Sequence, residues 1–450
     1  MRKKIITVAF IIIITFYGCN NSSKDVTIKE SSQNDTTDRT ESDQCLTLSI
    51  PMYFGSIVDI VHQYEKAHPN VKIEVQSAVN EGEYFYDISM DVFNDYVLQM
   101  ATDVMSSTDI DIYETGYLPY FKYSGSNAFE NLYDYMNEDP DFDQDDYYTN
   151  IFEALSDNGK LYLLPHHFSY NLVRLNRKYV DDSDVDSIFI NYKQLESLYT
   201  KAKQTHPKEA IDFSLNRSAY SYSFNAIELS SQLDLRNGQI ISDPERFKEY
   251  LEFEKVHLPH TIDEKLLPYD CVDPDPSDNK WFMNCFSFGL TNVNETSDAV
   301  SKPYLLSASN NDLQIQLCGG LYSISSHSKS KKLAWDFLMF MIEEKDYDFD
   351  SYDWKDYPLK IEYNIGVVSV NRNNFIKSAN QILGERYERD VKEDVEFWDS
   401  INKSVDHVIF TDSETYDIFY DIISDYEKDL IDVDECIQII QDKANIYLHE

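Results

Sequence analysis

Carboxylates are the most numerous reactive groups of this chain, with 80 Asp and Glu against 39 Lys and Arg. Glycoside hydrolysis needs two carboxylates that flank one bond, but among so many acids no pair is distinguished by its spacing. The motifs GxSxG, HExxH, GxxxxGK and GxGxxG do not occur. The sequence therefore predicts no enzyme and no cofactor.

Two segments have residues of the kind that bind metal ions. The run DPDFDQDD at 139–146 has acids at alternating positions, as calcium loops do. A calcium loop also needs Gly at its sixth place and Glu at its twelfth, where this chain has Gln144 and Asn150. His166 and His167 are adjacent, and neighbours on a strand are expected to point to opposite faces. We therefore expect a solvated acidic turn, one histidine facing a ligand, and no metal site.

Aromatic residues offer a different chemistry, because 34 Tyr and 25 Phe can line a binding site as well as fill a core. A flat ring covers the apolar face of a sugar ring, while carboxylates, amides and hydroxyls bond its polar rim. Tyr53, Phe54 and Tyr117 each follow a predicted strand, and Glu114 lies close to Tyr117. We expect these four residues to contact a ligand, whereas Trp335 and the aromatics of 337–340 lie on a helix and are expected in the core.

The elements that position these residues alternate along the chain. Apolar spacing predicts strands at 46–51, 71–76 and 109–113, with helices at 55–68 and 88–105 between them. This order implies a parallel α/β sheet with right-handed crossovers. Ligands of such sheets bind beyond the carboxyl ends of the strands, which indicates 52–54 and 114–117. Further helices are predicted at 192–204, 244–256 and 333–343, and from about residue 373 onward.

The first 45 residues differ from the rest. Three basic residues at 2–4 precede the apolar run 5–17 and then Gly18 and Cys19, which is the order of a bacterial lipoprotein signal. We expect residues 1–18 to be removed and Cys19 to be lipidated, with 19–45 as a flexible tether. An uncleaved anchor or a plain secretion signal is the alternative. No later segment reaches the length of a membrane span.

The charge and the cysteines narrow the choice of partners. A net charge of −41 repels nucleic acid and anionic lipid. The six cysteines show neither CxxC nor a Cys/His pattern, so structural zinc is not expected. Cys271 and Cys285 are the closest pair in sequence, and unpaired, partly buried thiols are the alternative to a disulfide.

Five segments together resemble the extracellular solute-binding proteins of family 1, the maltose-binding-protein-like class. These are DYVLQMATDVMSSTDIDIYETGYLPYFKY at 95–123, GKLYLLPHHFSYNLVRLNRKYV at 159–180, GGLYSISSHSKSKKLAWDFLMFMIEEK at 319–345, VVSVNRNNF at 367–375 and the last helix from residue 433. The resemblance covers nearly all of the chain after residue 45. It implies a two-lobe α/β fold of the class II periplasmic-binding-protein type, with a hinge between the lobes.

The resemblance also implies a division of the chain and further ligand contacts. Lobe 1 would hold 46–165 and about 290–343, and lobe 2 would hold 166–289 and 344–450. Phe168, Ser169 and Tyr170 match the crossover of the family, and Tyr222 lies in its aromatic loop, so these four are expected to contact the ligand. Asn171 is near enough to contribute to the polar rim.

The function that follows is capture of a carbohydrate, an oligosaccharide, by a monomer that the lipid on Cys19 holds outside the cell membrane. The protein would deliver this ligand to the transmembrane subunits of an ABC permease. A binding protein for another solute, such as a peptide or a polyamine, and a surface carbohydrate-active enzyme are the alternatives.

Overall fold

The computed structural model describes residues 44–51, 57–79, 89–106, 108–118, 123, 126–185, 187–209, 211, 227–232, 241–257, 282–285, 301–308, 314–343, 368–387, 390–409 and 413–449. Among these residues no helix is both long enough and apolar enough to cross a membrane. Tyr53, Phe54, Tyr222 and Cys19 lie outside the described residues, so their predicted roles stay predictions.

The alternating first part of the chain forms the parallel sheet that the periodicity predicts. Strand β1 (Gln44–Ile50) pairs in parallel with β2 (Val71–Ser77) and with β3 (Ile112–Glu114). Helix α1 (Ile57–Ala67) and helix α2 (Met90–Met105) are the two connections. All three strands and both helices were predicted, and the bounds of the helices agree to within three residues.

Segments far apart in the sequence complete this first sheet. Strand β9 (Gln314–Ile324) runs antiparallel to β3 on one side and to β4 (Leu164–Ser169) on the other. Strand β10 (Val368–Ser369) pairs with β4, and β11 (His407–Ile409) pairs in parallel with the start of β9. The sheet is therefore mixed, and β9 lies at its centre.

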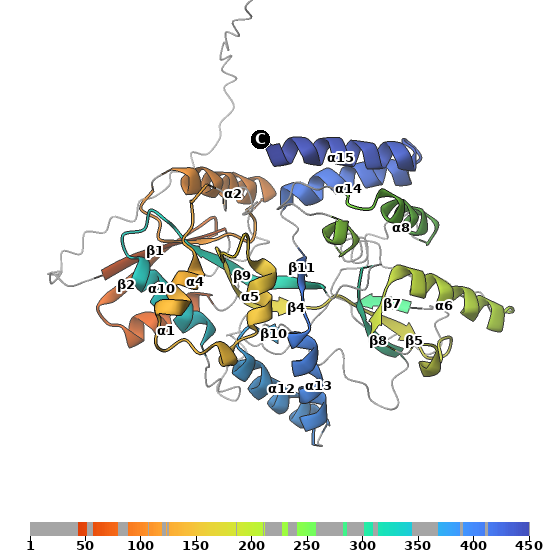
Figure 1. Ribbon diagram of the computed structural model, residues 1–450, viewed down its shortest axis with the longest axis horizontal. Helices are drawn as coiled ribbons and strands as arrows, with labels where there is room; N and C mark the ends of the chain where they lie inside the picture. Colours follow the sequence, from red (N-terminus) through yellow and green to blue (C-terminus); the bar gives the residue numbers. More distant parts are fainter. Residues whose placement is uncertain are drawn as a thin grey trace, which may run out of the picture. The chain divides into compact units, whose positions relative to one another are not determined.

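Helices α1 and α10 (Lys331–Ile342) pack beside this sheet (Figure 1). Helix α1 buries Ile57, Ile60, Val61 and Tyr64 at helical spacing. The ring of Tyr64 meets the edges of Phe337 and Phe340 at 5.2 Å each, and its hydroxyl donates to Asp336 at 2.5 Å. Trp335 is buried as predicted, and its indole N–H donates to Asp139 at 2.8 Å.

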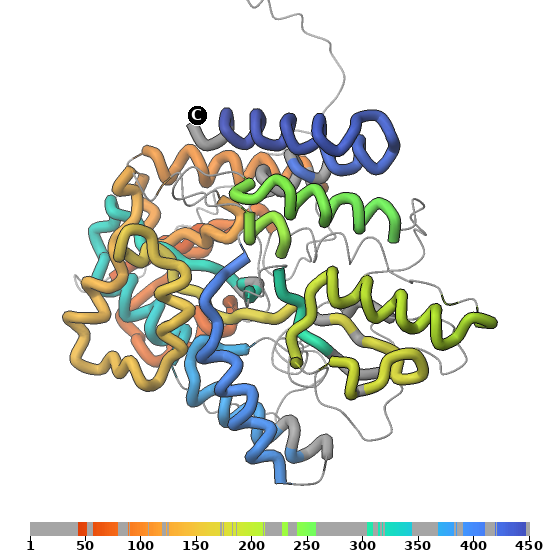
Figure 2. The backbone as a smooth tube through the Cα atoms, turned by 45° about the vertical axis from the view of Figure 1, so that its right-hand side comes forward, coloured from red at the N-terminus to blue at the C-terminus, as the bar shows by residue number. Residues whose placement is uncertain are grey.

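A second sheet has its own core. Its strand order is β6 (Phe189–Ile190), β8 (Ser301–Leu306), β5 (Leu172–Asn176) and β7 (Phe282–Cys285). Helix α6 (Tyr192–Thr205), helix α8 (Pro244–His257), helix α14 (Ser413–Glu427) and helix α15 (Val433–His449) supply the apolar residues of this second core. Asn191 and Gln194 close the start of α6 with a reciprocal capping box. Figure 2 traces α14 and α15 as a pair next to α8.

The remaining helices belong to the first core. They are α4 (Leu132–Glu138), α5 (Thr149–Leu155), α12 (Arg372–Tyr387) and α13 (Lys392–Lys403). The short η2 (Gln144–Asp146) contributes no buried residue. The acidic turn that includes η2 is largely exposed, as predicted, and Asp143 caps η2 by accepting from the N–H of Asp145. Trp398 of α13 is 3% exposed in this core.

A charged network joins α12, α13 and α5 inside the first core. Asp399 accepts two hydrogen bonds from Arg372, at 2.8 and 3.0 Å, one from Lys403 at 2.7 Å and one from the hydroxyl of Tyr148 at 3.0 Å. Asn402 donates to the same hydroxyl at 3.0 Å. Residues 372–402 are therefore tied to the element that precedes β4, and they do not contribute to the second core.

Candidate functional site

Glu114 lies at the carboxyl end of β3, where the sequence predicts a ligand contact. Its side chain is only 2% exposed. Oxygen Oε1 accepts the backbone N–H of Gly116 at 3.0 Å and that of Leu321 on β9 at 3.2 Å. Oxygen Oε2 is buried and has no hydrogen-bond partner. One half of the carboxylate is thus fixed by the backbone, and the other half is open to a donor from elsewhere.

The surroundings of Glu114 favour its protonated form. Burial raises the pKa of this carboxyl to about 7, although the two backbone N–H groups act in the opposite direction. Gly116 is required here, because a Cβ at this position would lie 2.6 Å from Oε1 of Glu114. The turn after β3 is therefore shaped around this carboxylate.

Tyr117 is the one predicted aromatic contact at this strand end that the structure describes. It is half-buried, and its ring meets the edge of Phe93 on α2 at 5.1 Å. The ring lies three residues from Glu114, so the prediction that the two act together on a ligand is compatible with their placement.

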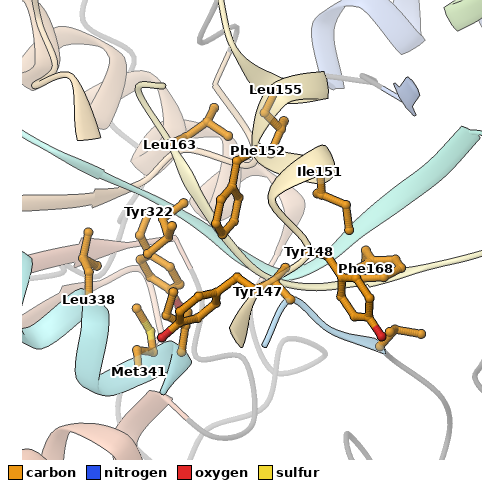
Figure 3. Close-up of a cluster of buried hydrophobic side chains, with 14 of the residues drawn as sticks. Tyr147, Tyr148, Ile151, Phe152, Leu155, Leu163, Phe168, Tyr322, Leu338 and Met341 are labelled. Carbon is orange, nitrogen blue, oxygen red and sulfur yellow. The ribbon is translucent and has the colours of Figure 1, made fainter. Parts of the chain in front are cut away.

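The predicted residues of the crossover point alternately to two faces of β4. Phe168 is 0% exposed and Tyr170 is 6% exposed, and both belong to the first core. The ring of Phe168 meets Tyr148 at 6.1 Å and Tyr170 at 5.8 Å (Figure 3). The hydroxyl of Tyr170 donates to Asn402 at 2.7 Å. Protein side chains therefore surround both rings.

The opposite face of β4 is polar although it is buried. His167, Ser169 and Asn171 alternate with Phe168 and Tyr170, and each is at most 3% exposed. The pKa of His167 is lowered to about 4 by burial, so this imidazole is neutral at pH 7. We call His167, Ser169 and Asn171 the polar face of β4.

The prediction that His166 and His167 point to opposite faces is wrong. Their ring centroids are 3.9 Å apart, and both side chains are buried. The pairing of β4 with β9 shifts register between Pro165 and His167. The extra residue of this bulge is on β9, where positions 319 and 320 stand opposite the single residue His166.

Sequence reasoning missed Gln314, the first residue of β9. Gln314 pairs with His407 of β11, and the backbone carbonyl of Asn171, between β4 and β5, accepts the N–H of Leu306 at 2.8 Å. The side chains of Gln314 and Asn171 are at most 2% exposed, and the amide nitrogen and oxygen of each have no hydrogen-bond partner. We call these two residues the amide pair. The signal in the sequence was a glutamine directly before the apolar Ile315 at the start of a strand.

The amide pair can both donate and accept hydrogen bonds without a net charge. An unpartnered buried polar group costs about 1–3 kcal/mol, so four such atoms indicate that a polar molecule completes their hydrogen bonds. Glu114 pairs with Tyr322 and Ser169 with Gln316, six positions along β9, which is about 20 Å of extended strand. Cross-strand partners share a face, so Glu114 lies on the face of Tyr322 and Leu164, whereas Ser169, five residues after Leu164, lies on the opposite face of β4.

Metal ligation has no support in the part of the chain that the structure describes. Among those residues no group of three or more His, Cys, Asp or Glu side chains is arranged to hold a metal ion. The side chains of Cys271 and Cys285 lie outside the described part, so the disulfide alternative stays open. Cys436 is buried in the second core, where burial raises the pKa of its thiol to about 12.

Comparison with known proteins shows the fold. No family model and no curated protein matches the sequence. A family 1 extracellular solute-binding protein from Alicyclobacillus acidocaldarius is similar in structure, with a TM-score of 0.55 and 15% identity over 92% of this chain and 100% of that one. An ABC substrate-binding protein from Listeria monocytogenes in complex with cycloalternan has a TM-score of 0.55 and 16% identity over 90% of this chain and 99% of that one.

The sugar-binding protein MalE from Xanthomonas citri gives a TM-score of 0.57 and 11% identity over 90% of this chain and 98% of that one. Most of the similar structures are binding proteins rather than enzymes, although one is described as a designed esterase. The chain therefore has the two-lobe α/β fold of the MalE-like solute-binding proteins, as the sequence predicts.

Proposed function

We propose that this protein captures a carbohydrate, an oligosaccharide, outside the cell membrane and delivers it to an ABC importer. The observation that carries the proposal is the amide pair, Asn171 and Gln314, whose side chains are buried and have no hydrogen-bond partner. Neutral donors and acceptors of this kind match the hydroxyl groups of a sugar. The similar structures include proteins described as binding cycloalternan and maltose.

The contact residues divide by their placement. We propose that Glu114, Tyr117, Ser169 and Asn171 touch the ligand, together with Tyr53, Phe54 and Tyr222. We assign Phe168 and Tyr170 to the support of the polar face of β4, because their rings are packed inside the first core.

The packing also supports a revised division of the lobes. Residues 368–408 contribute side chains to the first core, and β8 joins the second sheet. We propose that lobe 1 holds 44–170, 314–343 and 368–408, and that lobe 2 holds 171–308 and 413–449. The chain would then pass between the lobes near 170–171, 308–314 and 409–413, and these connections would form the hinge.

We further propose that the lobes close on the ligand, because a ligand that touches both lobes favours the closed form. In this proposal the protein is a monomer, a lipid on Cys19 holds it at the membrane, and the permease subunits accept the closed form.

The test begins with thermal shifts in a panel of maltose, maltotriose, cycloalternan, a tripeptide and spermidine. A ligand that binds the native state raises its stability. Stabilisation by a sugar supports the proposal, whereas stabilisation by the tripeptide or spermidine alone would refute the carbohydrate assignment.

Calorimetry on Asn171→Ala and Gln314→Ala then tests the site. Loss of one or two hydrogen bonds should weaken sugar binding by about tenfold or more in each variant. Gln438→Ala is the matched control, since this amide lies on the exposed side of α15 and bonds only Asp442 among the described residues. If both site variants bind within twofold of the parent, the amide pair is not the ligand site.

A further inference from the structure

The carboxylate of Glu114 differs from that of Asp111, the buried acid just before β3, in having an oxygen without a hydrogen-bond partner. Asp111, at the start of the same region, accepts the N–H of Thr47 at 2.9 Å and the hydroxyl of Ser328 at 2.5 Å, so both of its oxygens are bonded. In Glu114 both available backbone donors bond Oε1, and Oε2 has none. The fold therefore leaves one directed acceptor at the end of β3.

Among the residues that the structure describes, the elements packed around Glu114 bring no cation to this oxygen. On β9 the paired residue is Tyr322, and in the turn after β3 the titratable residue is Tyr117. Continuing the pairing of β1 with β3 by one residue places the apolar Ile50 beside Glu114. Burial and two backbone N–H groups account for the raised pKa of this carboxyl, and no charged side chain of the described residues contributes to it.

We infer that Glu114 is a specificity-determining residue whose Oε2 accepts a hydrogen bond from a donor group of the solute, so that solute binding releases a proton. The inference rests on the proposed solute-binding function. The donor is a hydroxyl in a carbohydrate or an ammonium group in a cationic solute. The carboxylic acid loses its proton to the buffer, and the carboxylate then accepts the O–H or N–H of the solute.

The direction of the coupling follows from the chemistry of the donor. A carboxylate accepts a hydrogen bond from a solute more strongly than its neutral acid does, because the bond is then charge-assisted. The solute therefore favours the ionised form and lowers the pKa of Glu114 from about 7. Affinity should rise by up to about tenfold per pH unit below pH 7 and level off above it.

The experiment is calorimetry with maltotriose in two buffers of different ionisation enthalpy at pH 7, where the difference in heat counts the protons released. The parent should release about half a proton per solute, because a group whose pKa equals the pH is half protonated. Glu114→Gln should release none, and its affinity should not vary with pH. Asp109→Asn is the matched control, since it removes one acid near β3 that is exposed and paired with Lys329, and it should behave as the parent does.

Several results would overturn the inference. These are binding by the parent without proton release, proton uptake on binding, or the same proton release in Glu114→Gln. The two-buffer measurement on the parent decides this even if the variant does not fold.

The panel of solutes gives different results according to whether the carbohydrate proposal or the role of Glu114 fails. If spermidine or the tripeptide binds with proton release and no sugar binds, the carbohydrate proposal fails while the role of Glu114 stands. If a sugar binds without proton release, the role of Glu114 fails while the carbohydrate proposal stands. If no member of the panel binds, both are overturned.

Discussion

The substitution Asp399→Asn tests whether α12 and α13 are integral to the first core. Asp399 is 9% exposed and accepts hydrogen bonds from Arg372, Lys403 and Tyr148. Burial by itself would raise the pKa of this carboxyl, but the hydrogen bonds from these three side chains outweigh burial and lower it. The ionised form is therefore the one that stabilises the fold.

The magnitude follows from the exposure of each partner. Lys403 has a side chain that is 49% exposed, so its ion pair contributes little, about 0–1 kcal/mol. Arg372 has a side chain that is 31% exposed and forms a two-bond pair, which is partly screened by solvent. Removing the charge should lower the free energy of unfolding by about 2 kcal/mol, within the range for charged hydrogen bonds. For a folded unit of the size of the proposed lobe 1, a loss of about 2 kcal/mol corresponds to a decrease in Tm of about 5 °C.

The assay is urea unfolding of Asp399→Asn and the parent at pH 7 and at acidic pH. Because the pKa of Asp399 is lowered in the folded state, its stabilisation is complete above the unfolded value of 3.8 and is lost as the pH falls through the folded value. The difference between the two proteins should therefore disappear only in strong acid. Hydrogen exchange should show the loss of protection in peptides from α5, α12 and α13.

A control and a second substitution sharpen this test. Asp434→Asn removes an exposed acid paired with Lys248 on α8 and should change stability by less than about 0.5 kcal/mol. In a double-mutant cycle, Tyr148→Phe and Asp399→Asn should couple by about 0.5–1 kcal/mol, because the hydroxyl of Tyr148 donates to Asp399. A loss in Asp399→Asn no larger than in the control, or one confined to peptides of α14 and α15, would refute the reasoning.

Four further predictions concern the site and the anchor. Glu114→Gln should raise the free energy of unfolding at pH 8 by up to about 3 kcal/mol. The parent carboxyl has a pKa of about 7 when folded and 4.5 when unfolded, so the parent loses stability as the pH rises between these values. Melts of the parent that show no difference between pH 4 and pH 8 would contradict this prediction. Phe168→Ala should cost about 3–5 kcal/mol in urea unfolding, because it opens a cavity in the first core, and a cost below about 1 kcal/mol would contradict its burial. Small-angle scattering should show a smaller radius of gyration with a saturating sugar, and an unchanged radius would count against closure. Mass spectrometry of the mature N-terminus should show a diacylglyceryl group on Cys19, and a retained Met1 would refute the lipoprotein prediction.

Local sequence was enough for the elements that depend on short-range patterns. The order strand, helix, strand, helix, strand from β1 to β3 follows from apolar spacing within windows of about fifteen residues. Helices α6, α8 and α10 were predicted for the same reason, since each has an apolar stripe and recognisable start signals. The fold class followed from this alternation together with the order of the resembling segments.

The placement of individual side chains depended on contacts between distant residues. The bulge opposite His166 arises only where β4 pairs with β9, more than 140 residues away. The burial of Gln314 depends on such long-range pairing too, because a strand read alone gives no register. The membership of α13 in the first core depends on its network with Tyr148.

The sequence by itself therefore determined the first three strands and the helices between them, helices α6, α8 and α10, that the first strands form a parallel α/β sheet, and which strand ends are candidate ligand positions. The tertiary structure decided which face of β4 is polar and buried, which predicted aromatics belong to the core, and that Glu114 keeps one unpartnered oxygen. The physical reason is that secondary structure responds to neighbours a few residues away, whereas burial and hydrogen-bond satisfaction are set by residues that only the folded chain brings into contact.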